Sequence, residues 1–124
     1  MILLDTSVLI DVLRGDPPAV SYVRSLDQVP FCSELSRVEV LQGLRARERR
    51  PAEELFDHLR WVGVDEAIAR RAGELGRQYL RSHANVGVVD LVIAATAVEL
   101  GAEPATLNTR HFPMFRSLRP PYGD

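Results

Sequence analysis

Four short apolar runs, separated by stretches with helical periodicity, restrict this chain to a small set of folds. The runs are residues 2–4, 29–32, 61–64 and 104–107. Residues 2–4 show no alternation of apolar and polar side chains, which is typical of a central parallel strand that is covered on both faces. Strands that alternate with helices predict an α/β fold, in which a parallel sheet of about four strands lies between layers of helices.

The stretches between these runs carry apolar residues at helical spacing. Helices are predicted over residues 8–13, 19–26, 35–44, 51–59, 66–79 and 91–100. We expect the third helix to run on into the arginine-rich stretch 45–50. Ser33 and Asp65 are suitable N-caps, Asp90 directly precedes the last helix, and Gly101 is a suitable C-terminal stop.

The length and composition indicate one folded domain spanning residues 1–124. Hydrophobic residues make up 46% of the chain and charged residues 26%, as in ordinary globular proteins. No apolar run approaches the roughly 18 residues that a membrane span needs, and Asp5 interrupts the first apolar stretch. We therefore expect a cytoplasmic protein without membrane contact. The single cysteine, Cys32, lies among apolar residues and is expected in the core.

The kind of basic residue excludes several classes of enzyme. All 15 basic residues are arginine, and the chain contains no lysine. A Walker A loop, a Schiff-base enzyme and a protein kinase each require a lysine, so none of these sites can be built here. The net charge of −2 gives no general attraction to nucleic acid, although arginine suits local phosphate contacts.

Three acidic residues fall where the predicted fold places a binding site. Ligands bind outside the carboxyl ends of the strands in an open parallel sheet. Asp5 follows the first strand, Glu39 lies in the helix after the second, and Asp90 lies at the start of the apolar helix. Carboxylates that share an apolar setting repel one another, and a divalent cation removes that repulsion. Oxygen ligands favour Mg²⁺ or Mn²⁺, which lower the pKa of bound water and neutralise a phosphoryl oxygen.

Each acid taken alone has a simpler interpretation. Asp5 and Asp90 occupy positions where an N-cap is common, and Glu39 suits a solvated helix face. The joint spacing of the three argues for a shared site.

The chain resembles the PIN-domain ribonucleases, and in particular the VapC-type toxins of bacterial toxin–antitoxin pairs. The resemblance rests on four stretches in the family's order: LLDTSVLID at 3–11, SELSRVEVLQG at 33–43, VVDLVIAATAVELGA at 88–102 and ATLNTRHF at 105–112. It implies a PIN-like α/β/α fold and a metal-dependent endoribonuclease. The implied partners are RNA, a small antitoxin that occludes the acidic site, often with an inserted arginine, and a second copy of the chain.

Carried over residue by residue, the resemblance assigns Asp5 and Asp90 as the principal metal ligands and Glu39 as the third acid. Gly43 would let its helix approach the sheet closely. The hydroxyls of Thr6 and Ser7 would steady the cluster or bind substrate. At the fourth position, where many relatives carry an acid, this chain has Asn108, a neutral oxygen ligand that favours one metal ion over two.

Basic residues near these motifs are candidates for contact with the substrate. Arg110 is predicted to bind substrate at the rim of the site. His111 either contacts substrate or is a loop residue beside a packed Phe112. The arginines at positions 45, 47, 49 and 50 either bind RNA phosphates or form a solvated helix end.

Two other functions compete with the ribonuclease. A phosphatase or phosphorelay receiver also begins with an aspartate after the first strand. A phosphatase of that kind needs a second aspartate where this chain has Ser7, and both classes need a lysine. The remaining alternative is a PIN-like binding or scaffold module that has lost catalysis through Asn108.

Overall fold

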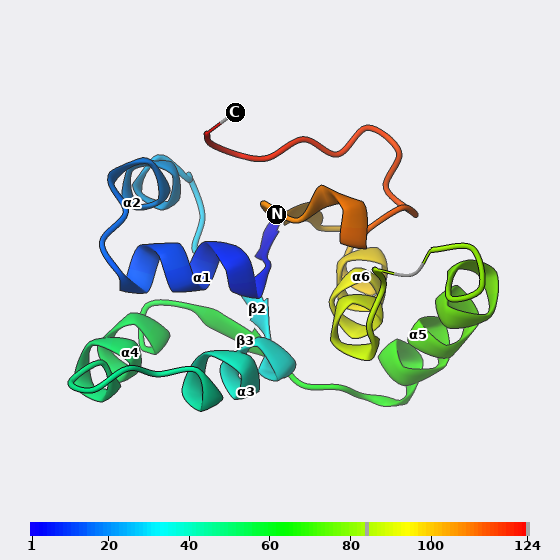
Figure 1. Cartoon of the computed structure of the whole chain (residues 1–124), viewed down its shortest axis with the longest axis horizontal. Helices are drawn as coiled ribbons and strands as arrows, with labels where there is room; N and C mark the ends of the chain where they lie inside the picture. Colours follow the sequence, from blue (N-terminus) through cyan, green and yellow to red (C-terminus); the bar gives the residue numbers. More distant parts are fainter. Residues whose placement is uncertain (84, 124) are drawn as a thin grey trace.

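The computed structural model describes residues 1–83 and 85–123, and residues 84 and 124 of the predicted domain lie outside that description. Within this part of the chain, four strands form one sheet (Figure 1): β1 (Ile2–Leu4), β2 (Phe31–Ser33), β3 (Arg60–Val62) and β4 (Glu103–Ala105). The helices are α1 (Thr6–Leu13), α2 (Pro17–Arg24), α3 (Glu34–Gln42), α4 (Arg49–Phe56), α5 (Glu66–Tyr79) and α6 (Val88–Leu100), with a short 3₁₀ turn, η1 (Thr109–His111).

The sheet has the order β3-β2-β1-β4, and every neighbouring pair is parallel. The chain builds outward from β1 through β2 to β3, and then returns to the other side of β1 to form β4. The direction of winding therefore reverses between β1 and β4. In open α/β sheets, ligands bind at such a reversal.

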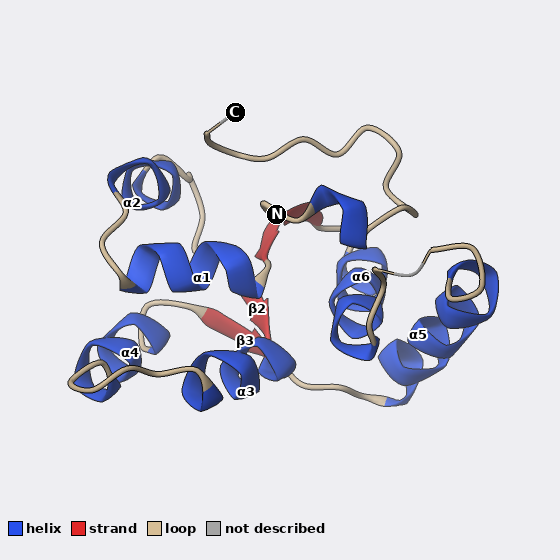
Figure 2. Cartoon of the chain, viewed as in Figure 1, coloured by secondary structure: helices blue, strands red, loops and turns tan. Residues whose placement is uncertain are grey.

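Helices cover both faces of the sheet, as the sequence predicts. Figure 2 shows the strands between one group of helices that includes α1, α3 and α4 and another formed by α5 and α6. Successive residues of β1 point to opposite faces: Leu4 belongs to the core cluster of Leu9 and Phe56, whereas Leu3 belongs to that of Ile93. Both leucines of this strand are almost completely buried. The predicted α/β/α arrangement is confirmed.

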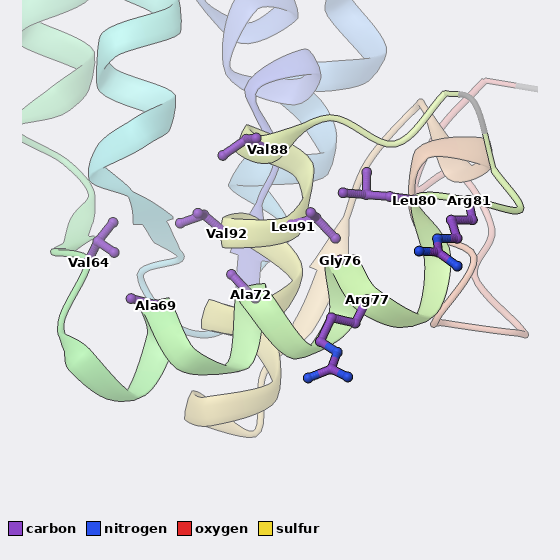
Figure 3. Close-up of a pocket in the computed structure, with 11 residues that line it drawn as sticks. Val64, Ala69, Ala72, Gly76, Arg77, Leu80, Arg81, Val88, Leu91 and Val92 are labelled. Carbon is purple, nitrogen blue, oxygen red and sulfur yellow. The ribbon is translucent and has the colours of Figure 1, made fainter.

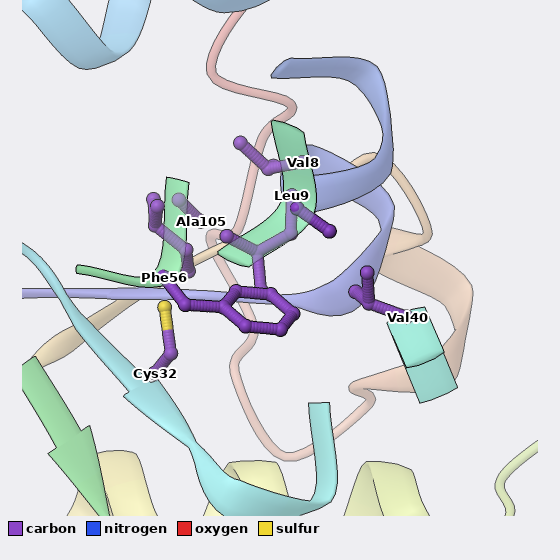
Figure 4. Close-up of a cluster of buried hydrophobic side chains, with 8 residues drawn as sticks. Val8, Leu9, Cys32, Val40, Phe56 and Ala105 are labelled. Carbon is purple, nitrogen blue, oxygen red and sulfur yellow. The ribbon is translucent and has the colours of Figure 1, made fainter. Parts of the chain in front are cut away.

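Cys32 belongs to the core on the α1 side of the sheet, as expected. Its side chain has no exposed surface and lies beside Phe56 and Leu9 (Figure 4). Burial raises the pKa of the thiol to about 12. The residue is therefore a packing group, since the reactive form of cysteine is the thiolate.

The strands are shorter than predicted, or displaced along the chain by one or two residues. The second begins at Phe31 and leaves Val29 exposed outside the strand, and the third spans residues 60–62. The fourth ends at Ala105, where the register with β1 also ends: Leu4 pairs with Ala105, and the Asp5 amide then donates to the Ala105 carbonyl at 2.9 Å. The short partner strand thus releases residues 106–108 from the sheet.

The prediction that the third helix continues into the arginine-rich stretch is wrong. Helix α3 ends at Gln42, and the amide of Gly43 closes it by donating to the carbonyls of Glu39 and Val40. The chain then turns, and Glu48 holds the turn by accepting from the Arg45 amide at 2.6 Å.

The close-packing role assigned to Gly43 is also wrong. A Cβ atom at Gly43 would meet only carbonyl oxygens of its own preceding turn, the nearest being that of Glu39 at 3.4 Å. The tight contact lies elsewhere, at Gly76 of α5, where a Cβ atom would lie 3.2 Å from Leu91 Cδ1. Gly43 ends a helix, and Gly76 brings α5 against α6.

Helix α6 begins at Val88, two residues before Asp90, so Asp90 lies inside its first turn rather than ahead of it. Its residues 91–97 are all buried, which explains the nearly continuous apolar sequence. The helix ends as predicted at Gly101, which adopts a left-handed conformation with φ of 67°. In residues 1–83 and 85–123, no helix combines the length and apolar character needed to cross a membrane.

The conformation of Gly101 predicts the effect of substituting it. A side chain in the left-handed region costs roughly 1–2 kcal/mol, so Gly101→Ala should lower the free energy of unfolding by about that amount in urea denaturation. Gly63→Ala is the matched control, because Gly63 does not have a positive φ and no atom lies within 4 Å of a Cβ atom there. This control should be neutral or stabilising by up to about 1 kcal/mol. Equal effects of the two substitutions would contradict the assigned backbone conformation.

Candidate functional site

A cleft of about 610 Å³ opens at the carboxyl ends of β1 and β4, where the winding of the sheet reverses. Six residues predicted for the site line it: Asp5, Thr6, Ser7, Glu39, Asp90 and Asn108. They come from the segments that follow β1, β2 and β4 and from the first turn of α6. The fold thus brings into one cleft residues from widely separated parts of the sequence.

Asp5 is a buried carboxylate, with 4% of its surface exposed. It precedes α1 as the N-cap residue, yet its side chain makes no capping hydrogen bond. Its Oδ2 atom instead accepts from the hydroxyl of Ser7 at 2.9 Å and from that of Thr106 at 2.6 Å. The simple capping interpretation of Asp5 is therefore wrong, because the side chain is held by the groups around it.

Backbone amides after β4 orient both hydroxyls. The Leu107 amide donates to Ser7 Oγ at 3.2 Å, and the Asn108 amide donates to Thr106 Oγ1 at 2.9 Å. Each hydroxyl accepts from the backbone and donates its single proton to Asp5. Within the described residues, Oδ1 of Asp5 accepts no hydrogen bond, yet no fully buried polar side-chain atom lacks a partner. Oδ1 is therefore the carboxylate oxygen that remains accessible to the cleft.

Glu39 is also held in place rather than freely solvated. Thr6, which is buried, donates from Oγ1 to Glu39 Oε1 at 2.6 Å. The hydroxyls of Thr6 and the fully buried Ser36 lie 2.9 Å apart, which ties the start of α1 to α3. The carboxylate of Glu39 thus has a fixed position on the wall of the cleft.

Asp90 lies in the first turn of α6 and partly caps it, because its Oδ2 atom accepts from the Gly87 amide at 3.0 Å. The capping interpretation is therefore correct in part. Burial raises the pKa of the Asp90 carboxyl, and the negative charge of Asp5 adds to this effect. The Gly87 amide and the nearby His111 lower the pKa, but they do not cancel the effect of burial. Asp90 therefore lies in a setting that disfavours its charged form, and the charge of Asp5 contributes to that effect.

The 3₁₀ turn η1 places His111 in the cleft beside Asp90. Its Nδ1 atom lies 3.4 Å from Asp90 Oδ2. Phe112, the next residue, is fully buried, so the packing expected at that position is present as well. Asn108 precedes η1 and lines the same cleft, and its side chain makes no capping hydrogen bond. A contact of His111 or Asn108 with substrate stays a prediction.

The arginines predicted to contact RNA lie outside the cleft. Arg110 lines a separate hollow and is not among the residues that line the cleft. The exposed residues Arg45, Arg47, Arg49 and Arg50 are not among the residues that line the cleft. Their contact with phosphate stays a prediction.

The acids share the cleft without forming a closed metal cage. Within residues 1–83 and 85–123, no three histidine, cysteine, aspartate or glutamate side chains gather closely enough to enclose a metal ion. Glu39 is held by its hydrogen bond from Thr6. The assignment of Asp5, Glu39 and Asp90 as ligands stays a prediction.

The sequence analysis missed three residues of this site. Thr106 donates to Asp5, and Ser36 contacts Thr6. Asp11 lines the cleft further along α1 and accepts from the hydroxyl of Tyr122 at 2.9 Å. Thr106 carried a usable signal, since it follows an apolar strand just as Thr6 and Ser7 do. Ser36 and Asp11 depend on helix packing, which the sequence does not specify.

Comparison with known sequences identifies relatives along the whole chain. The profile of the PIN domain matches residues 2–116. Ribonuclease VapC19 of Mycobacterium tuberculosis is 43% identical over 125 aligned positions, which cover 98% of this chain and all of the relative. Ribonuclease VapC10 of the same organism is 44% identical, over 99% of this chain and 94% of the relative.

The fold is similar to that of solved structures. A toxin–antitoxin complex from Klebsiella pneumoniae contains a chain that superimposes with a TM-score of 0.81 and 24% sequence identity. The match covers 98% of each chain. At this level of identity, the likeness supports the fold alone.

The raised pKa of Asp90 predicts how its removal affects stability. A carboxyl group with a raised pKa in the folded state binds protons more tightly there than in the unfolded chain. Its contribution to stability is therefore lost as the pH rises from the ordinary aspartate range through the raised value. Asp90→Asn should unfold at a higher temperature than the wild type at pH 7, and this advantage should shrink below about pH 4.

Thermal unfolding followed by circular dichroism across this pH range tests the expectation. Asp27→Asn is the control, because Asp27 is an exposed aspartate in the turn that follows α2. An Asp90→Asn protein that tracks the wild type at every pH would show that this carboxylate does not strain the folded state.

Proposed function

The chain belongs to the PIN-domain family, among its VapC-type ribonucleases, and on that premise we propose that it is a divalent-metal-dependent endoribonuclease. In the cell it acts as the toxin of a toxin–antitoxin pair in the cytoplasm. The observation that best supports this function is the pairing of Asp5 with Asp90 in the cleft where the sheet winding reverses. Two partly or fully buried carboxylates in one cleft are costly to maintain, and a bound cation offsets that cost.

The donor atoms of the cleft fit Mg²⁺ or Mn²⁺. The carboxylates of Asp5, Glu39 and Asp90 offer only oxygen atoms as metal ligands, and the Asn108 side chain offers its carbonyl oxygen. Magnesium commonly uses only one or two carboxylates and keeps several waters, so it does not need a closed cage of three acids. Asp5 and Asp90 would hold such an ion, and Glu39 would orient its water. When bound, the ion neutralises charge on the phosphodiester and makes water a stronger nucleophile.

The protein's own contribution is to fix the carboxylates in advance. Ser7 and Thr106 hold Oδ2 of Asp5, which leaves Oδ1 toward the cleft. Thr6 holds Glu39, and the Gly87 amide holds Asp90. Groups that are positioned before the reaction lose little energy to reorganisation as charge develops. His111, beside Asp90, is placed to contact the substrate or a leaving group.

The proposed partners follow from the family and from two surfaces. An antitoxin that inserts an arginine into the acidic cleft would block it by charge.

A second, apolar groove of about 730 Å³ lies between α5 and α6 and includes the exposed side chains of Val64, Leu80 and Val88 (Figure 3). Val88 is 70% exposed, and apolar surface of this kind marks contact sites. We propose that a second copy of the chain covers it in a homodimer.

A catalytically inactive binding module remains the competing function. Asn108 in place of an acid is the observation that favours it. The two functions differ in metal affinity. Calorimetric titration with Mn²⁺ should show binding that Asp90→Ala abolishes if the site is active, whereas a scaffold would bind no metal and still dimerise.

Cleavage of RNA tests the proposed function directly. The purified protein should cut structured RNA in Mg²⁺, stop when EDTA is added, and recover with excess Mn²⁺. Asp5→Asn and Asp90→Asn should each cut about a thousandfold more slowly, since charge neutralisation by a metal is worth several kcal/mol. Asp27→Asn should cut at the wild-type rate. Wild-type rates in both cleft variants would show that these carboxylates are not the ligands.

The hydrogen bond from Thr106 to Asp5 predicts different effects of two substitutions at position 106. Thr106→Val keeps the shape but removes the donor, so we expect Mn²⁺ affinity and the cleavage rate to fall by about 10–100-fold. Thr106→Ser retains the hydroxyl and should restore most of both. A Val variant that binds Mn²⁺ as tightly as the wild type would show that the hydroxyl does not position Asp5.

A further inference from the structure

A second hollow adjoins the acidic cleft, and we call it the flanking pocket. It has a volume of about 410 Å³ and is lined by Ser82, His83, Asn85, Thr109, Arg110 and Pro113. Two segments contribute residues to both spaces: the stretch that leads into the first turn of α6, and the stretch that follows β4. In the turn around η1, Asn108 and His111 line the cleft, whereas Thr109 and Arg110 line the flanking pocket. A ligand longer than one nucleotide in the cleft would reach the flanking pocket by crossing this single turn.

The two spaces differ in charge. The cleft is lined by four acids: Asp5, Asp11, Glu39 and Asp90. None of the described residues that line the flanking pocket is acidic, and Arg110 contributes an exposed guanidinium. An RNA strand with one phosphate near the acids gains from a cation beside the next phosphate, and arginine suits such a contact.

The remaining polar groups of the flanking pocket are suited to a base. The Nδ1 atom of His83 lies 2.7 Å from Ser82 Oγ, and its ring packs edge-on against Tyr79 with the ring centres 5.7 Å apart. Among the described residues, Nε2 of His83 makes no hydrogen bond. Asn85 is exposed and offers an amide that both donates and accepts. Flat polar side chains of these kinds hydrogen-bond to base edges and stack on bases in single-stranded RNA.

We propose that the flanking pocket binds the nucleotide next to the scissile phosphodiester of a single-stranded RNA segment. Arg110 contacts the phosphate, and His83 and Asn85 select the base. The inference rests on the proposed ribonuclease function and adds to it a determinant of the cleavage sequence. It also gives Arg110 a role outside the acidic cleft.

Cleavage of one long transcript that contains all four bases in many contexts tests the proposal. The 5′ ends of the products are mapped for the wild type, Arg110→Ala, Arg110→Lys, Asn85→Ala and His83→Ala in Mn²⁺. Arg110→Ala should raise KM about tenfold at every site. The slope of log binding affinity against log salt concentration should become shallower by about 0.7, the value for one phosphate contact on a single strand. Arg110→Lys should recover most of the affinity.

The base-reading residues should behave differently. Asn85→Ala and His83→Ala should weaken the preference for one base beside the cut roughly tenfold, with little change in rate at the least preferred sites. Arg24→Ala is the control, because it removes an exposed arginine from the last turn of α2. It should leave the rates, the sites and the salt dependence unchanged.

The outcomes separate the two proposals. A wild-type protein that cuts no RNA would refute the ribonuclease function itself. A wild type that cuts, with Arg110→Ala and Asn85→Ala matching Arg24→Ala in rate, sites and salt dependence, would refute the flanking pocket alone. An Arg110→Lys protein as impaired as Arg110→Ala would also refute it, since loss of a phosphate contact should be repaired by another cation.

Discussion

The hydrogen-bonded burial of Asp5 is the interaction on which the rest of this site depends. A carboxylate at the end of a central strand loses most of its contact with water, and that loss must be offset by donors. Here the donors are two hydroxyls, Ser7 from the first turn of α1 and Thr106 from the end of β4. Both are oriented in turn by backbone amides. The carboxylate is therefore fixed by the same contacts that hold β1, α1 and the exit of β4 together.

This arrangement explains why the site lies where the sheet winding reverses. Between β1 and β4 the following segments diverge, α1 toward one face and the chain after β4 toward η1. The divergence leaves a cleft whose walls carry Glu39 and Asp90 from helices on opposite sides of the sheet. Burial in this cleft raises the pKa of the Asp90 carboxyl, and the charge of Asp5 adds to that effect. The carboxylate whose charged form is disfavoured is thus one of those that line the candidate site.

The sequence was sufficient to predict the parallel α/β fold, because short apolar runs and helical periodicity report burial directly. It also placed Asp5, Glu39 and Asn108 at one edge of the sheet, since the segments that follow parallel strands meet there, and it placed Asp90 beside them at the start of the apolar helix. It failed where the outcome depends on side-chain direction or local backbone geometry. It also could not show that Arg110, two residues after Asn108, lines a separate pocket rather than the cleft. Gly43 has the spacing of a packing residue but lies beyond the last turn of its helix.

The position of Pro104 has a consequence for how the molecule meets other chains. The Glu103 amide and the Ala105 carbonyl face β1, so the backbone of Pro104 faces the open side of the edge strand. Proline has no amide proton, and the outer rim of the sheet therefore lacks a donor at its centre. Strand-by-strand extension of the sheet, the usual route to unwanted aggregates, is disfavoured there. The edge formed by β4, which borders the candidate site, is thereby protected against pairing with a strand of another chain.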